Sequence, residues 1–108
     1  MELTLLHEPG GLPALDLPPA IAAAYPGTLG FETPRLFANF VATVDGVVAV
    51  PGLPQSNKLI AAGSRADRFV MGLLRACADC VVLGSGTLAA SPGGLWTPAQ
   101  AFPDAAAA

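Results

Sequence analysis

The distribution of apolar residues along the chain predicts a strand, a helix and a second strand between residues 36 and 83. Residues 36–44 (LFANFVATV) place apolar side chains on both faces of an extended segment, which is typical of a central strand. Residues 64–78 carry apolar side chains at spacings of three and four, which predicts a helix. Residues 81–83 (VVL) form a short apolar run without alternation and predict a strand buried on both faces.

Polar residues mark the boundaries of these elements. Ser64 has the chemistry of a helix N-cap, with Asp67 three residues later as in a capping box. Asp45-Gly46 is a strong turn signal that ends the first strand, and residues 47–50 resume it. Because a strand–helix–strand unit normally makes a right-handed crossover, we expect residues 36–44 and 81–83 to be parallel strands of one sheet.

The flanking regions are interpreted as less regular. Residues 1–34 are rich in Pro and Ala, and we interpret them as an N-terminal extension with a short strand at 3–6 and a short helix at 18–25. Residues 52–58 and 91–104 have loop composition. The run 104–108 is helix-forming but stops without a cap, so we expect residues 35–108 to be an incomplete domain.

A glycine turn follows the second predicted strand. Gly84, Ser85 and Gly86 lead into Thr87 and a possible helix start, and glycine lets a backbone approach a phosphate closely. Thr87 adds a hydroxyl that can cap the helix or bond a phosphate oxygen. The stretch therefore favours an anion site, although an ordinary strand-to-helix turn that binds nothing stays an equal alternative.

Composition limits the classes of function. The 108 residues include 5 basic and 8 acidic ones, for a formal charge of −3, so a basic surface for nucleic acid is not expected. No apolar run has the length of a membrane span, and the start lacks the basic region of a signal peptide. We therefore expect a cytoplasmic protein that contacts neither nucleic acid nor membrane.

Metal and nucleophilic chemistry have little support. Cys77 and Cys80 form a single C-x-x-C at the end of the predicted helix, where neither a zinc site nor a thioredoxin-like thiol is expected. His7 is the only histidine, so a Ser-His-Asp set is not expected either. Residues 84–89 fit the dinucleotide fingerprint G-x-G-x-x-A with Asp104 about 20 residues on, but no strand pattern precedes that acid.

Four motifs in order resemble a known family. They are residues 39–49 (NFVATVDGVVA), 67–69 (DRF), 73–79 (LLRACAD) and 84–88 (GSGTL). Over residues 35–98 the chain resembles the pyrimidine reductase family of riboflavin biosynthesis, the C-terminal part of the bifunctional deaminase–reductase. The resemblance implies an α/β, dihydrofolate-reductase-like three-layer sandwich with a mostly parallel sheet, truncated here to its N-terminal half.

The same resemblance implies an NADPH-dependent reduction of the ribosyl group of an aminopyrimidine. By motif position, Thr43 and the turn Gly84, Ser85, Gly86 and Thr87 would bind NADPH, and Asp45 and Arg75 would bind the substrate. No residue is assigned as catalytic. Ser91 and Pro98 stand where the family carries an acid and an arginine for the ribose phosphate, so a related, unphosphorylated substrate is an alternative.

Two other classes of function stay open. One is a non-catalytic fragment, or a subunit that needs a partner chain to complete its sheet. The other is a nucleotide-binding module without redox chemistry. We expect the 108 residues alone to be inactive and to associate through uncovered apolar surface, and the complete protein to be a homodimer.

Overall fold

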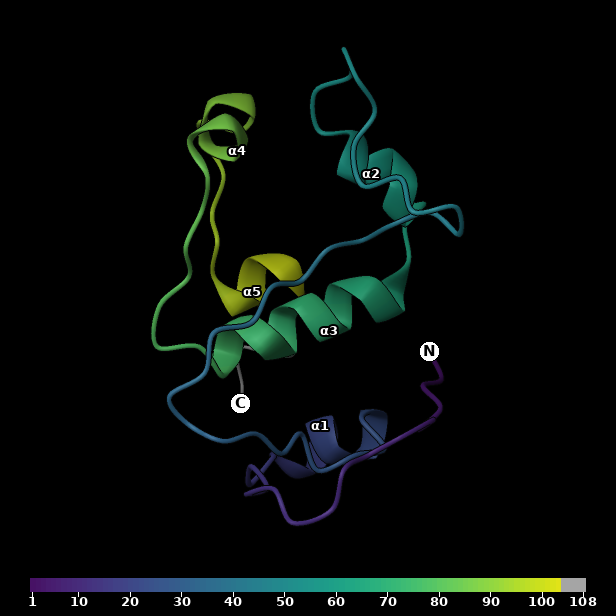
Figure 1. Cartoon of the computed structure of the whole chain (residues 1–108), viewed down its shortest axis with the longest axis vertical. Helices are drawn as coiled ribbons and strands as arrows, with labels where there is room; N and C mark the ends of the chain where they lie inside the picture. The colour runs from purple at the N-terminus through teal and green to yellow at the C-terminus, as the bar shows by residue number, and fades with distance from the viewer. Residues whose placement is uncertain (104–108) are drawn as a thin grey trace.

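A long central helix organises the chain. The computed structural model describes residues 1–103, in which the helices are α1 (Pro19–Ala24), α2 (Ser56–Ala61), α3 (Arg65–Ala76), α4 (Ser85–Ala90) and α5 (Pro98–Ala101). Helix α1 lies on one side of α3, and α5 packs against the other side (Figure 1). Helices α2 and α4 lie beyond α5, on two separate arms of the chain (Figure 1).

Helix α3 forms where its apolar spacing predicts a helix. Ser64 is its N-cap, and its hydroxyl accepts a hydrogen bond from the backbone N–H of Asp67 at 3.2 Å. Phe69 and Leu73, four residues apart on one face, are each only 1% exposed. The predicted helix and its cap are therefore confirmed, and its buried face is the centre of the fold.

The core joins both ends of the chain to α3. Ile21 of α1 is buried with Phe69 and Leu73 in one cluster. Phe102, just after α5, meets the ring of Phe69 edge to face, with centroids 5.3 Å apart. The N-terminal layer and the C-terminal segment thus share a single small core.

Two short helices lie in regions that composition assigns to loops. Helix α5 begins with the N-cap Thr97, whose hydroxyl accepts from the backbone N–H of Gln100 at 3.3 Å, followed by Pro98 at the first helical position. Helix α2 falls at the end of the predicted loop 52–58 and has no side-chain cap. The Thr-Pro pair was a readable start signal for α5, whereas α2 offered none. The helix predicted at 18–25 is confirmed as α1, which also has proline in its first turn.

The predicted sheet is not formed. No residue from 1 to 103 is in a strand, so the α/β dihydrofolate-reductase-like sandwich, and with it the parallel pairing of residues 36–44 and 81–83, is wrong for this structure. Leu36 is 91% exposed, Phe40 75% and Val82 81%. The physical reason is that an apolar extended segment becomes a buried strand only when neighbouring strands satisfy its backbone and cover its faces.

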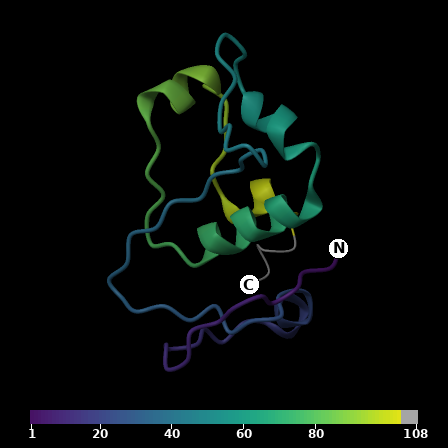
Figure 2. The same ribbon diagram turned by 45° about the vertical axis from the view of Figure 1, so that its right-hand side comes forward.

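The chain is more open than a compact monomer of its size. Its accessible surface is 7,696 Å², whereas roughly 5,500 Å² is typical for this mass. The radius of gyration is 14.8 Å, against about 13 Å for a compact chain of this length. The stretch between α1 and α2 runs as an irregular ribbon across the molecule (Figures 1 and 2), and it carries much of the uncovered apolar surface.

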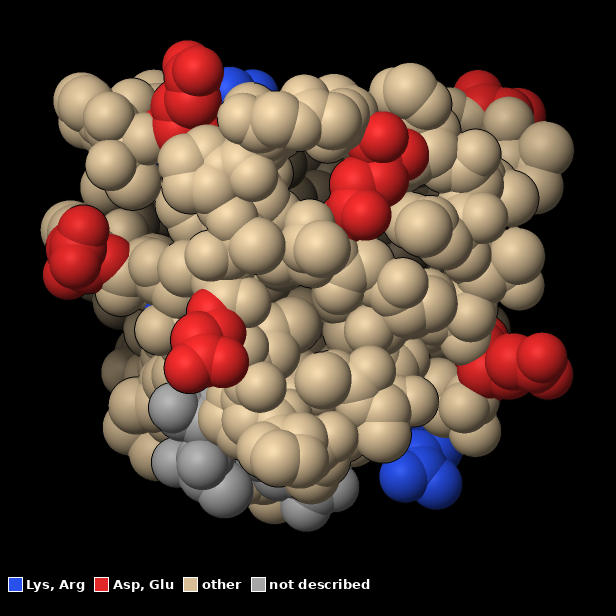
Figure 3. All heavy atoms as spheres, turned by 90° about the horizontal axis from the view of Figure 1, so that it is seen from below, with Lys and Arg blue, Asp and Glu red and all other residues tan. Residues whose placement is uncertain are grey.

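Charge is unevenly distributed. Residues 1–34 contain no Lys or Arg, and the face seen in Figure 3 carries scattered acidic groups with few basic ones. Three of the five basic residues of the chain (Arg65, Arg68 and Arg75) lie on α3 instead. Among the described residues, no helix combines the length and hydropathy required to cross a membrane.

Candidate functional site

Thr43 and Asp45 form one tight turn. The backbone N–H of Gly46 donates to the carbonyl of Thr43 at 2.9 Å, and the N–H of Thr43 donates to the carbonyl of Val47 at 3.0 Å. Gly46 has a φ of 88°, a left-handed conformation that glycine adopts without a Cβ clash. The predicted Asp45-Gly46 turn is therefore present, although no strands flank it.

Side-chain hydrogen bonds fix this turn. The Thr43 hydroxyl donates to the Asp45 carboxylate and accepts from the backbone N–H of Val47 at 2.9 Å. The hydrogen bond from Thr43, followed by one from the backbone N–H of Asp45 itself, lowers the pKa of the Asp45 carboxyl. Asp45 is exposed and ionised at neutral pH, so it can accept further hydrogen bonds from a polar ligand.

At the glycine turn, the predicted helix start is present but the predicted strand is not. Helix α4 does start at Ser85, with Gly84 as its N-cap residue, but residues 81–83 before it are exposed and irregular. Thr87 lies inside the helix rather than at its cap, and α4 has no side-chain cap hydrogen bond. The strand–turn–helix arrangement on which the anion site was predicted is thus present only in its helical part.

The glycines of this turn have open surroundings. A Cβ at Gly84 or Gly86 would meet no atom within 4 Å, and Gly84 has an ordinary φ of −74°. Neither position therefore requires glycine for the conformation or packing of this chain. Gly86 even costs about 1 kcal/mol relative to alanine inside a helix.

Arg75 contacts α5 and the segment before it, not the other predicted site residues. Its guanidinium donates to Oε1 of Gln100 at 3.2 Å and lies over the ring of Trp96, 5.4 Å from the centroid. Partial burial lowers the pKa of Arg75, but a guanidinium stays charged. Arg75 thus binds the segment that leads into α5, and Trp96 packs against the helix, with its indole N–H buried and unpartnered among the described residues.

The predicted site residues make their contacts within three different parts of the chain. Thr43 and Asp45 bond within residues 43–47, Arg75 contacts the α5 segment, and residues 84–87 begin α4. One hydrogen bond, from Nε2 of Gln55 to the carbonyl of Ala90 at 2.9 Å, connects the start of α2 to the end of α4. In the described part of the chain, no hydrogen bond joins the Thr43 turn to the glycine turn.

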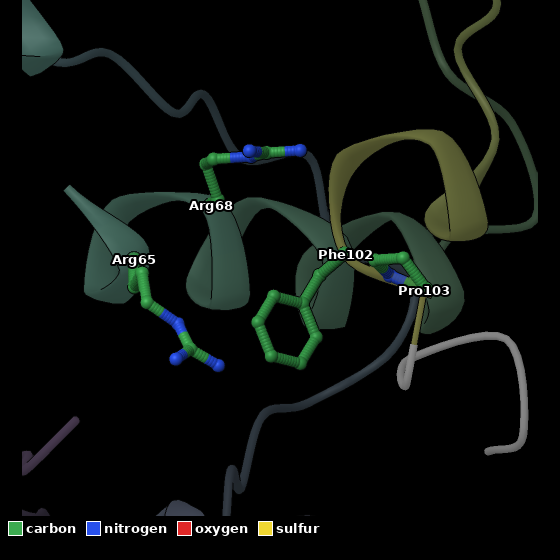
Figure 4. A pocket seen from close by; sticks show the side chains of 4 residues that line it. All are labelled: Arg65, Arg68, Phe102 and Pro103. Carbon is green, nitrogen blue, oxygen red and sulfur yellow. The ribbon is translucent and has the colours of Figure 1, made fainter. Parts of the chain in front are cut away.

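A cavity that sequence reasoning missed lies at the start of α3. It has a volume of about 330 Å³ and is lined by Arg65, Arg68, Phe102 and Pro103 (Figure 4). The two arginines are three residues apart on α3, a spacing that the sequence shows but that solvated helix charge explains equally well. The cavity exists only because the fold brings Phe102, more than 30 residues away in sequence, next to these arginines.

Potential metal ligands do not gather into a site within the described residues. Among residues 1–103, His, Cys, Asp and Glu form no group of three or more that could hold a metal ion. Cys77 and Cys80 are both free thiols, and burial raises the pKa of Cys77. Asp104, the acid of the dinucleotide fingerprint, and the helix-forming run 104–108 lie outside the described residues.

No family model matches the chain, and no curated protein or solved structure matches it either.

Proposed function

We propose that this chain is part of an NADPH-dependent reductase acting on an aminopyrimidine ribosyl substrate in the cytoplasm. The proposal is supported by the four motifs that occur in family order between residues 39 and 88. The observation that carries it is the glycine turn. Gly84 and Gly86 are exposed, and neither conformation nor packing accounts for them, whereas a ligand approaching the backbone would.

The residues of the turn are suited to part of a dinucleotide. Exposed backbone at Gly84, Ser85 and Gly86, with the hydroxyl of Thr87, would bind phosphate oxygens of NADPH. Thr43 would join the cofactor site, and Asp45 and the remaining N–H groups of Arg75 would bind the substrate. NADPH supplies the hydride, and the protein's part is to orient the two molecules and to exclude water.

Turnover requires all three groups of residues to act on one bound pair of cofactor and substrate. Reacting groups must be held within a fraction of an ångström of productive geometry. Thr43, Thr87 and Arg75 are now bonded within separate parts of the chain. We therefore expect the 108 residues alone to bind NADPH weakly and not to turn over.

The experiment is a titration with NADPH in which binding is measured by fluorescence or calorimetry. It compares the parent chain with two variants. Thr87→Val should weaken binding by about 1–2 kcal/mol, roughly 5- to 30-fold, because a hydrogen bond to a charged oxygen is lost. Gly86→Ala should raise the thermal stability of α4 while weakening NADPH binding, because the added Cβ favours the helix but stands between backbone and ligand.

The matched control is Thr4→Val, the same change at another exposed threonine. Equal affinity for NADPH in Thr87→Val, Gly86→Ala and the control would remove the glycine turn from the site. Equal binding of NADPH, NADH and ATP by the parent would favour the alternative of a nucleotide-binding module without redox chemistry.

A second candidate is a non-catalytic subunit that requires a partner chain. The observation that favours it is the uncovered surface, roughly 2,000 Å² more than a compact monomer exposes. An excess of this size resembles the area that an obligate interface buries. In this case a second copy or another subunit would cover the apolar residues of 36–50 and 81–83, and NADPH would bind only to the assembly.

A further inference from the structure

The cavity at the start of α3 concentrates positive charge on an otherwise acidic protein. Two of the five basic residues, Arg65 and Arg68, line a space of about 330 Å³, although the chain carries a net charge of −3. Both side chains are exposed, and no ion pair joins either of them to an acidic side chain within residues 1–103. Guanidinium groups that line one cavity can bind the same anion, because each offers paired N–H donors.

Contacts with the core fix the walls of this cavity. Nε of Arg68 donates to the carbonyl of Ala101 at 3.2 Å, which holds its stem against the end of α5 and leaves the terminal nitrogens for a ligand. Arg65 and the ring of Phe102 project toward the same space, from α3 and from the segment after α5 (Figure 4). The edge-to-face contact with Phe69 holds the Phe102 ring in place.

The chemistry of these walls defines the ligand. Guanidinium groups bind phosphate with paired N–H donors, and they do so better than ammonium groups because of their planar fork. An aromatic ring with an adjacent proline offers a flat apolar wall on which a base or another planar ring can lie. A volume of about 330 Å³ is at the lower end of small-molecule pockets, which admits a mononucleotide-sized compound.

We propose that the cavity between Arg65, Arg68 and Phe102 binds a phosphorylated small molecule with a flat ring, in the chemical class of a nucleoside monophosphate. The phosphate lies between the two guanidinium groups, and the ring lies against Phe102. The site is separate from the glycine turn, and the proposal does not depend on reductase activity. Asp67 is the acidic residue of the same helical turn and opposes the phosphate charge.

The test is calorimetric titration of the full 108-residue chain with AMP, inorganic phosphate, ribose 5-phosphate and adenosine at low ionic strength. AMP should bind most tightly, ribose 5-phosphate and phosphate more weakly, and adenosine at least tenfold more weakly than AMP. Raising the salt concentration should weaken the binding of the three phosphate compounds, because salt screens charge interactions. The binding of uncharged adenosine should stay unchanged. Adenosine binding as tightly as AMP, or no binding of any phosphate compound at 10 mM, would overturn the proposal.

Variants locate the site. Arg65→Ala should weaken AMP at least about tenfold, since a charged pair of hydrogen bonds is lost, and Arg35→Ala, the same change at an exposed arginine outside the cavity, should have no effect. Arg68→Lys keeps the positive charge but loses the planar, two-pronged set of N–H donors. The affinity for AMP should therefore fall several-fold while the chain stays folded. Asp67→Asn should increase the affinity for AMP, because it removes a negative charge that opposes the phosphate.

Thr87→Val and Thr4→Val, the second at an exposed threonine outside both sites, supply the final comparison. Thr4→Val should leave AMP affinity unchanged, and Arg65→Ala should weaken AMP binding more than Thr87→Val does. Loss of AMP binding in Thr87→Val, together with normal binding in Arg65→Ala, would place the nucleotide at the glycine turn and overturn the proposal. Failure of NADPH to bind anywhere would end the reductase proposal but leave this one intact.

Discussion

The guanidinium of Arg75 lies over the indole ring of Trp96, 5.4 Å from the ring centroid. The same guanidinium donates to Gln100 on α5 at 3.2 Å and contacts Sδ of Met71, one turn back on α3, at 3.3 Å. Because Trp96 lies just before α5 and Gln100 lies within it, this one side chain holds the α5 segment against the central helix. A structural function of Arg75 is therefore visible, whereas the substrate contact stays a prediction.

These two functions of Arg75 predict different results. Arg75→Ala should destabilise the chain by about 1–2 kcal/mol, from a partly desolvated cation–π contact and a charged hydrogen bond. Trp96 fluorescence during urea unfolding measures this loss, and Arg75→Lys should restore part of it. If Arg75 also binds substrate, kcat/KM of the reductase should fall in Arg75→Lys with NADPH affinity unchanged. Unaltered stability in Arg75→Ala would contradict the structural role.

Thr43 should control the acidity of Asp45. Its hydroxyl donates to the carboxylate and so lowers the folded-state pKa of Asp45. A group with a depressed folded pKa stabilises the turn above its unfolded pKa, and this stabilisation disappears as the pH falls through the folded pKa. Thr43→Val should therefore raise the pKa of Asp45, as followed by the carboxyl carbon resonance during an acid titration. An identical titration curve in parent and variant would show that the hydroxyl does not bond the carboxylate in solution.

Sequence reasoning succeeded where a local signal was sufficient. Helix α3 follows from its apolar spacing and the Ser64 cap, and the turn at Asp45 follows from the Asp-Gly pair. It failed where the structure depends on distant partners. Residues 36–44 have a strand pattern, but a strand needs a neighbouring strand, and within residues 1–103 none is formed.

The candidate sites divide in the same way. The start of α4 was predictable from residues 84–88 alone, although Ser85 and Gly86 belong to the helix itself and not to a turn before it. The Arg65 and Arg68 cavity was not, because Phe102 reaches it only through the packing of its ring on Phe69. A spacing of charges on one helix carries no information about which residues from elsewhere will face it.

The two thiols should differ in reactivity. Cys77 is partly buried, and this burial raises its pKa, whereas Cys80 is exposed. Because the thiolate is the reactive form, Cys80 should be alkylated several-fold faster than Cys77 at pH 8. Mass spectrometry of the folded chain after a short iodoacetamide pulse measures both rates, and denatured chain serves as the control. Faster modification of Cys77 would show that the C-terminal end of α3 is accessible to solvent and reagent.

The small core should be sensitive to the shortening of any of its buried side chains. Leu73 is 1% exposed and packs in the cluster with Ile21 and Phe69. Leu73→Ala should cost about 2–5 kcal/mol, which is a large share of the 5–15 kcal/mol typical of a domain. Circular dichroism during thermal unfolding should show a much lower midpoint or no transition. Leu59→Ala, at an exposed leucine of α2, is the matched control and should change the midpoint little.

The uncovered apolar surface should drive association of the chain. Leu36, Phe40 and Val82 are all more than two-thirds exposed, and exposed apolar surface favours contact between molecules. Sedimentation velocity from low to high micromolar concentration should therefore show a dimer or larger species. The variant Leu36→Ser with Phe40→Ser should shift the distribution toward monomer, while Leu6→Ser, at an equally exposed leucine of the N-terminal layer, should not. A parent chain that stays monomeric at 100 μM would show that the extended segments do not form an interface between copies, and a second copy would then be ruled out as the partner chain.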